Sequence, residues 1–96
     1  WAMFNKGATL GELGMSQAAI ESYDRLIQKF QDHDEPTIAE LVARAMFYKG
    51  VALYKLGMPQ PAIEQYDMLI QKFEDRNEPT IAKWVAKAKG NKQDIL

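Results

Sequence analysis

The chain has 96 residues, 47% of them hydrophobic and 26% charged, which is the balance of a soluble globular domain. Its 12 basic and 13 acidic residues leave a net charge of −1, which argues against nucleic acid as the main partner because phosphate binding needs a basic surplus. Cysteine is absent, so disulfides, thiol nucleophiles and cysteine-ligated zinc are excluded. No apolar run approaches the roughly 18 residues of a membrane span and no signal peptide is visible, so we expect no membrane partner and favour a cytoplasmic location.

An internal repeat is the main signal in the sequence. The stretch from Met3 aligns without a gap to the stretch from Met46, and 28 of 43 positions are identical. A third copy begins at Lys89 and fails at once, because polar residues replace the expected apolar ones. The chain therefore holds two copies of one unit.

Each copy opens with a pair of predicted helices. In the first copy we expect one helix over 1–13, ended by Gly14, and a second that starts at an N-cap Ser16 and runs to about Phe30. In the second copy Pro59 takes over the start of the equivalent helix, which runs to Phe73. The second helices carry apolar residues at spacings of three and four, the stripe of an amphipathic helix: Ala19, Ile20, Tyr23, Leu26, Ile27 and Phe30, repeated as Ala62, Ile63, Tyr66, Leu69, Ile70 and Phe73.

Two further helices come after polar connections. We expect a long helix over 35–56 and a last helix from Glu78 onward, with Asp34 and Asn77 as side-chain caps. The last helix turns polar after Ala88, which suits a helix that closes an array. No segment alternates with period two, so we expect no sheet.

The repeated unit resembles the tetratricopeptide repeat family. The family's spaced large and small residues are matched by Met3, Gly7 and Leu10, then by Ala19 and Tyr23, although Lys6 replaces the family's leucine. Ordinary repeats of this family have about 34 residues, and this one has 43. The nine extra residues keep helical spacing, so we expect them to lengthen the first helix of each pair. Helix-pair repeats of the HEAT class are the alternative.

The resemblance implies an all-α, right-handed α-solenoid of antiparallel helix pairs. We expect a single domain with a first repeat over about 1–34, a second over about 35–77 and a capping helix over about 78–96. Gly7 and Gly50 lie in mid-helix, where glycine is costly, and this predicts a close approach of the paired helices, with Ala19 and Ala62 on the opposite faces.

In this family the first helices of successive pairs line a concave groove that binds peptides. Carried over by alignment, the groove-facing positions are Phe4, Ala8, Gly11, Arg44, Phe47, Val51, Tyr54, Lys55 and Lys87. Phe4 and Phe47 could equally belong to the core. Apolar residues stand where the family's carboxylate clamp needs polar or basic ones, so we expect no such clamp. The lysines and Arg44 would favour acidic ligands.

Nothing in the sequence supports catalysis or a cofactor. The only histidine, His33, stands in a polar connection, and neither Asp32 nor Asp34 has the spacing of a calcium loop. We therefore expect a non-enzymatic scaffold that binds a protein or peptide, with no catalytic, cofactor or metal site. The alternative is a structural building block, or an excerpt of a longer array, that self-associates through an uncapped N-terminal face.

Overall fold

The computed structural model describes residues 8–96, with side chains from residue 15 onward. Four helices come one after another in this range: α2 (Ala8–Phe30), α3 (Pro36–Lys55), α4 (Pro59–Phe73) and α5 (Pro79–Ile95). Residues 8–96 contain no strand. The all-α prediction is confirmed.

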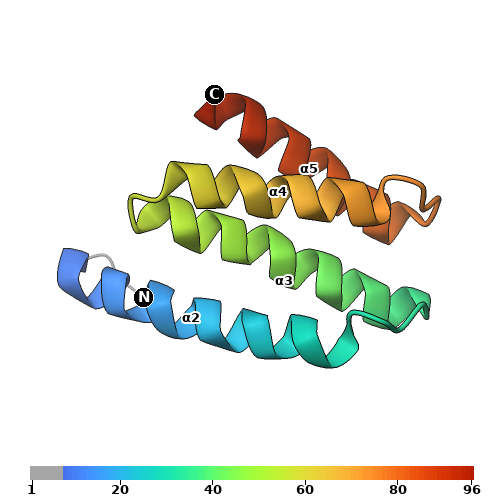
Figure 1. The fold of residues 1–96 in the computed structure, drawn as a ribbon, viewed down its shortest axis with the longest axis horizontal. Helices are drawn as coiled ribbons and strands as arrows, with labels where there is room; N and C mark the ends of the chain where they lie inside the picture. Colours follow the sequence, from blue (N-terminus) through green and yellow to red (C-terminus); the bar gives the residue numbers. More distant parts are fainter. Residues whose placement is uncertain (1–7) are drawn as a thin grey trace.

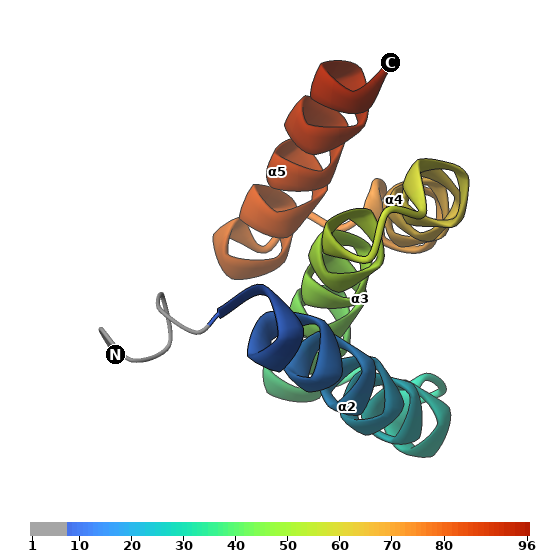
Figure 2. The ribbon, with the colours of Figure 1, turned by 90° about the vertical axis from the view of Figure 1, so that its left-hand side faces the viewer.

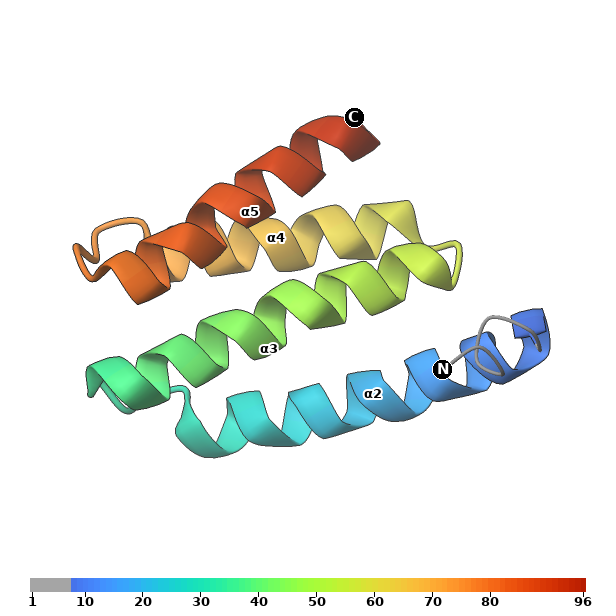
Figure 3. The ribbon, with the colours of Figure 1, turned by 180° about the vertical axis from the view of Figure 1, so that it is seen from behind.

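The helices stack side by side, with α3 in the middle (Figure 1). α2 lies on one side of α3 and α4 on the other, and neighbours in the chain run in opposite directions (Figure 3). α5 packs against both α3 and α4. Its early turns pack against α3, where the Trp84 ring meets the Phe47 ring, and its later turns contact α4 through Asn91 and Lys92. This arrangement matches the predicted solenoid of antiparallel pairs.

Proline sets the start of three helices. It occupies the first helical position in α3, α4 and α5, as Pro36, Pro59 and Pro79. The N-cap is then the preceding residue, which is Glu35 in α3 and Glu78 in α5, and neither makes a side-chain cap hydrogen bond. The predicted caps at Asp34 and Asn77 are therefore wrong, because proline at the first position fixes the start one residue later.

The turn between α3 and α4 is the helix end predicted for the second copy. Gly57 has a φ of +80°, which is the left-handed conformation that glycine adopts without steric cost. The Met58 N–H donates to the Leu53 carbonyl (3.0 Å), and the Gly57 N–H donates to the Tyr54 carbonyl (3.0 Å). These two bonds form a Schellman motif, which satisfies carbonyls at the end of α3.

The first copy has no such turn. α2 runs without a break from Ala8 to Phe30, so the predicted helix end at Gly14 is wrong. Ser16, expected as an N-cap, lies inside the helix with 8% of its surface exposed. The part of the predicted first helix that precedes Ala8 lies outside the described residues.

The core centres on α3 and its contacts with α4 and α5. Its largest fully buried side chains are Tyr66, Leu69, Ile81 and Val42. A Cβ built on Gly50 would stand only 2.5 Å from the Tyr66 ring, so α3 and α4 approach closely at this glycine, as predicted. The partner differs from our expectation, since the three nearest atoms belong to Tyr66 rather than to Ala62. Ala62 is nevertheless fully buried.

Candidate functional site

A hollow of about 240 Å³ is lined by residues of α3, α4 and the C-terminal turns of α5. Figure 2 shows these turns of α5 extending away from α3. α3 contributes three residues that were predicted to face the groove: Val51, Tyr54 and Lys55. α4 and α5 supply the remaining lining residues, which are Tyr66, Asn91, Asp94 and Ile95. Tyr54 is 53% exposed, which is unusual for a large aromatic side chain. One apolar and aromatic surface with a polar floor is thus open on this side of the molecule.

The floor of the hollow carries a polar pair. The Asn91 amide Nδ2 donates to the Tyr66 hydroxyl at 3.2 Å, which joins α5 to α4. Burial raises the pKa of the Tyr66 hydroxyl, and the hydrogen bond from Asn91 opposes this shift in part. Tyr66 therefore keeps its proton at neutral pH and offers a neutral hydroxyl at the base of the hollow.

The rim of the hollow carries one charge of each sign. Lys55 comes from the last turn of α3 and is exposed, and Asp94 comes from the last turns of α5 and is also exposed. A rim with one cation and one anion has no net preference for acidic ligands.

Two other predicted groove residues, Arg44 and Lys87, lie outside this hollow. Arg44 is exposed and lines a separate hollow between α2 and α3, beside Tyr23 and Tyr48. The Lys87 ammonium lies over the Trp84 ring, 4.8 Å from its centroid. Phe4 and Gly11 lie outside the residues whose side chains are described, as does the side chain of Ala8. The hollow between α3 and α5 thus gathers Val51, Tyr54 and Lys55 but not Arg44 or Lys87.

Phe47 contributes to the core. Its ring is 8% exposed and lies 5.8 Å from the Tyr66 ring and 5.4 Å from the Trp84 ring, centroid to centroid. Trp84 is itself 4% exposed, and its indole N–H has no hydrogen-bond partner among the described residues. Phe47 therefore supports the wall behind the hollow and offers almost no surface to a partner.

Two ion pairs join the helices at equivalent positions of the two copies. Lys49 on α3 pairs with Asp24 on α2 at 2.6 Å, and Lys92 on α5 pairs with Asp67 on α4 at 2.6 Å. Both members of the second pair lie 43 residues after their counterparts in the first. The second helix of one copy is therefore tied to the first helix of the next in the same way twice.

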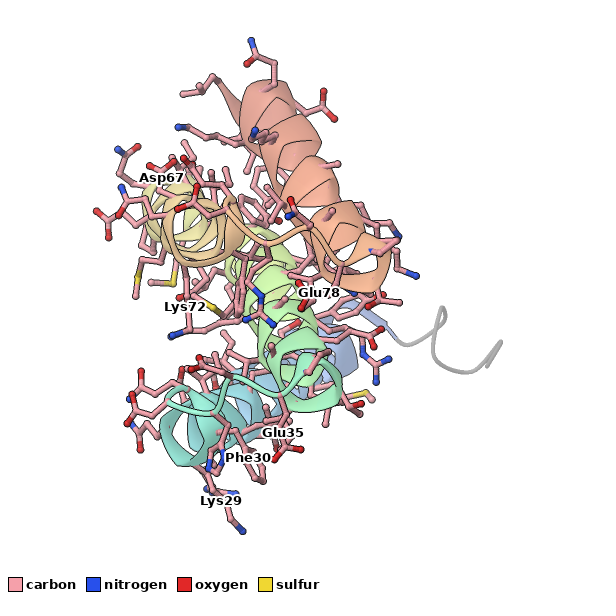
Figure 4. The ribbon with its side chains drawn as sticks, turned by 90° about the vertical axis from the view of Figure 1, so that its right-hand side faces the viewer. Lys29, Phe30, Glu35, Asp67, Lys72 and Glu78 are labelled. Carbon is pink, nitrogen blue, oxygen red and sulfur yellow. The ribbon has the colours of Figure 1, made fainter. Side chains whose placement is uncertain are left out.

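The connections at the opposite end are tied to each other as well. The Lys72 ammonium extends from α4 toward α2 and donates to the Gln31 carbonyl at 2.8 Å (Figure 4). The Arg76 guanidinium donates to the Asp34 carbonyl at 3.1 Å and to both carboxylate oxygens of Glu78, at 3.0 and 2.9 Å. The hydrogen bonds from Arg76 hold the pKa of Glu78 below its ordinary value. These hydrogen bonds join the α2–α3 connection to α4 and to the α4–α5 connection.

A larger and more open hollow, about 490 Å³, lies between α2 and α4 with α3 as its floor. Its exposed apolar residue is Met68, which is 55% exposed, and several of its charged groups are already engaged in the pairs described above. Its lining residues are Asp24, Ile27, Gln28, Gln31, Met46, Lys49, Gln65, Met68, Gln71 and Lys72. This hollow offers a partner fewer free charges and less aromatic surface than the one between α3 and α5.

The sequence reasoning missed the second wall and the floor of the α3–α5 hollow. Asn91, Asp94 and Ile95 belong to the segment that we assigned only to a polar cap. One signal could have pointed to Asn91: it stands 43 residues after Tyr48, so a short amide takes the place of an aromatic ring next to the last turns of α5. The floor residue Tyr66 was assigned to the apolar stripe of its helix, and its hydroxyl was overlooked.

Residues 15–96 contain no group of three histidine, aspartate or glutamate side chains that could hold a metal ion. His33 is exposed and packs edge-on against the Phe30 ring, 5.7 Å between centroids. Among the described helices none is both long and apolar enough to cross a membrane.

The fold and the site define a class of protein, the helix-pair repeat scaffolds. A family model described as tetratricopeptide repeat matches residues 1–33 and 44–75, which together make up about two thirds of the chain. The chain belongs to the tetratricopeptide repeat family. Domains of this family are non-catalytic scaffolds built from helical repeats, and they typically bind proteins or peptides. No curated protein and no solved structure gives a significant match to the chain.

Proposed function

We propose that the chain is a protein-interaction scaffold that binds a peptide or protein segment in the hollow between α3 and α5. The observation that carries this proposal is that Val51, Tyr54 and Lys55, which family resemblance assigns to a peptide groove, line one hollow together with α5. The half-exposed Tyr54 ring is the main anchor, because aromatic residues dominate the energetics of interfaces. Lys55 and Asp94 at the rim orient the segment.

The proposal assigns different roles to the remaining groove residues. Phe47 stiffens the wall from behind, through its contacts with Tyr66 and Trp84. Arg44 and Lys87 extend the surface along α3 and α5, outside the hollow, where they add long-range attraction for acidic flanks of the segment. Phe4 and Ala8 are assigned to the groove by family resemblance alone, and their side chains lie outside the described residues.

A peptide library tests the proposed site directly. Peptides would be selected from a random display library on the wild-type chain, and their affinities measured by fluorescence anisotropy. We expect Tyr54→Ala to lower the affinity by about tenfold or more, the scale of a buried aromatic anchor. Arg44→Ala should lower it less and in a salt-dependent way.

Met68→Ala is the matched control. Met68 is as exposed as Tyr54, at 55% against 53%, but it lies on α4 and faces the other hollow. We expect the affinity of the Met68→Ala variant for the selected peptides to stay within about twofold of the wild-type affinity, because Met68 lies outside the proposed interface. Peptides that bind Tyr54→Ala as tightly as the wild type would show that the groove assignment is wrong.

A second candidate function is self-association as a structural building block. The apolar stripe of α2 is only half-buried, whereas most of the equivalent stripe of α4 is buried beneath α3. A hollow remains between α2 and α3, lined by Tyr23, Leu26, Leu41, Arg44, Ala45 and Tyr48. A second copy of the chain that covers this face would bury apolar surface at about 25 cal/mol per Å².

Sedimentation velocity over a range of concentrations tests this candidate. We expect association that increases with concentration and is weakened by Leu26→Glu, which would place a charge in the covered face. Met68→Glu, on α4, should leave the association unchanged. A chain that stays monomeric at every concentration would remove self-association from consideration.

A further inference from the structure

The two residues that form the floor of the α3–α5 hollow, Tyr66 and Asn91, have counterparts 43 residues earlier that make a different contact. In the first copy the Tyr23 ring stacks on the Tyr48 ring, with centroids 6.4 Å apart. In the second copy the position of Tyr48 is taken by Asn91, and the stacked pair becomes a hydrogen bond from Asn91 to the Tyr66 hydroxyl. A short amide in place of an aromatic ring leaves space above Tyr66 and puts polar atoms at the base of that space.

The Asn91–Tyr66 pair keeps unused hydrogen-bonding capacity. A tyrosine hydroxyl offers one donor and two acceptor sites, and an asparagine amide offers two donors and one acceptor oxygen. Among the described residues the pair makes one side-chain hydrogen bond, in which Asn91 donates and Tyr66 accepts. The Tyr66 hydroxyl proton and the Asn91 Oδ1 atom both remain available, so the floor presents one donor and one acceptor.

The walls of the hollow select for an apolar body. Val51 and Ile95 face it from α3 and α5, and the exposed Tyr54 ring forms one edge. The volume, about 240 Å³, is below the roughly 300–1,000 Å³ of pockets that hold drug-sized ligands. The hollow has room for one large side chain, or for a probe of that size, rather than for a drug-sized ligand.

We propose that the hollow between α3 and α5 takes one tyrosine side chain of the partner segment. The ring lies between Val51, Ile95 and Tyr54, and the hydroxyl reaches the Asn91–Tyr66 pair, where it can both accept from Tyr66 and donate to Asn91. This inference rests on the proposed peptide-binding function and names its anchor residue.

Phenylalanine fits the walls equally well but not the floor. Its ring would cover the Tyr66 hydroxyl and the Asn91 oxygen and offer them no hydrogen-bond partner, and leaving such groups covered without a partner is costly. A net hydrogen bond of ordinary strength corresponds to a preference of about tenfold for tyrosine over phenylalanine.

Two small probes test the inference without a known partner. p-Cresol is the side chain of tyrosine and toluene is the side chain of phenylalanine, and each would be titrated into isotope-labelled protein while amide shifts are followed by NMR. We expect p-cresol to shift the resonances of Val51, Tyr54 and Asn91 with an affinity about tenfold above that of toluene. Equal affinities for the two probes would overturn the inference.

Asn91→Leu is the decisive variant, because it removes the floor acceptor and the hydrogen bond to Tyr66. We expect the preference for p-cresol to disappear or reverse, while Asn77→Leu, in the exposed connection before α5, keeps it. If Asn91→Leu does not fold, Tyr66→Phe removes the floor hydroxyl with less change in packing and should also abolish the preference. A preference that survives either folded variant contradicts the inference.

The outcomes distinguish a failure of the tyrosine-anchor inference from a failure of the proposed peptide-binding function. Selected peptides that bind at Tyr54 without a preferred tyrosine, together with equal affinities for p-cresol and toluene, would show that the tyrosine anchor is wrong. The proposed peptide-binding groove would remain supported by the effect at Tyr54. If neither the probes nor the selected peptides respond to changes at Tyr54, the groove itself is wrong.

Discussion

The two copies of the repeat carry almost the same six residues at the middle of the helix pair, yet they fold differently there. The first copy reads Leu-Gly-Met-Ser-Gln-Ala over 13–18, and the helix runs through it. The second reads Leu-Gly-Met-Pro-Gln-Pro over 56–61, and one helix ends while another begins. Glycine permits a left-handed turn, but proline prevents the helix from continuing. The comparison teaches that the prolines, rather than the glycine, decide the fold at this point.

This difference between the copies also changes how deeply the second helices, α2 and α4, are buried. In the second copy the turn brings α3 back along α4, and Tyr66 and Leu69 are almost fully buried. In the first copy the equivalent residues, Tyr23 and Leu26, are only half-buried. Nearly identical stripes thus bury different areas, because α4 packs against both α3 and α5, whereas α2 packs against α3.

The largest expected effect comes from making the first copy like the second. The double change Ser16→Pro and Ala18→Pro places prolines inside α2, where each removes a helical hydrogen bond at a cost of about 3 kcal/mol. We expect α2 to break near Gly14 and its amides to lose protection against hydrogen exchange, while α4 and α5 keep theirs.

Gln17→Ala, at an exposed position of the same turn, is the control and should change little. Unchanged exchange in the double-proline variant would mean that the helix in solution already ends at Gly14, and the contrast between the copies would be lost.

A smaller effect is expected where α3 and α4 approach most closely. Gly50→Leu would push a side chain into the Tyr66 ring, and overpacking of this kind costs about 1–3 kcal/mol. For a chain of this size each kcal/mol lowers the melting temperature by about 4–8 °C. Thermal unfolding followed by circular dichroism measures the shift.

Gly90→Leu separates packing from helix propensity. Gly90 also lies within a helix, but a Cβ added there would meet nothing within 4 Å. We expect this variant to be as stable as the wild type or more stable, because leucine favours the helix. Equal melting temperatures for both variants would refute the close contact at Gly50.

The buried tyrosine of the second copy predicts a loss of stability in alkali. Burial raises the pKa of Tyr66 in the folded chain above its ordinary value of 10.0. Above about pH 10 the unfolded chain therefore releases this proton before the folded chain does, so the free energy of unfolding falls as the pH rises toward the folded-state pKa. Chemical denaturation at pH 8 to 11 should show this fall.

Tyr66→Phe removes the titrating group and keeps most of the packing. We expect this variant to be less stable near neutral pH, because the hydrogen bond from Asn91 is lost, and to show a weaker alkaline decline. An identical decline in the variant and the wild type would assign it to other groups.

The smallest expected effect concerns the two equivalent ion pairs. Lys49→Ala and Lys92→Ala each remove one partly exposed pair, and such pairs contribute about 0.2–1 kcal/mol at low salt. We expect the two losses to be similar and to shrink as salt is added. Urea denaturation at two salt concentrations measures both, and clearly unequal losses would show that the two steps are not equivalent.

Much of the fold could be predicted from the sequence. The bounds of α3 and α4 and the start of α5 come from apolar spacing and from proline at the first helical position, which are local signals. The continuity of α2 could not be predicted from Gly14, because a glycine is compatible with both a turn and a helix. The next residues decide between the two, and Ser16 does not forbid a helix as Pro59 does.

The candidate site could be predicted on one side only. Val51, Tyr54 and Lys55 could be assigned by family resemblance, and they share one face of α3 because residues three and four apart are neighbours on a helix. The opposite wall depends on the angle at which α5 crosses α3 and α4, and that angle is set by packing between distant residues such as Phe47 and Trp84. No spacing within α5 reveals that Asn91 and Ile95 face a hollow.

The ion pairs Asp24–Lys49 and Asp67–Lys92 carry a geometric consequence. A further unit of the same sequence would present the same aspartate and lysine 43 residues later. Recurrence of the pair therefore marks the register in which the second helix of one unit lies beside the first helix of the next.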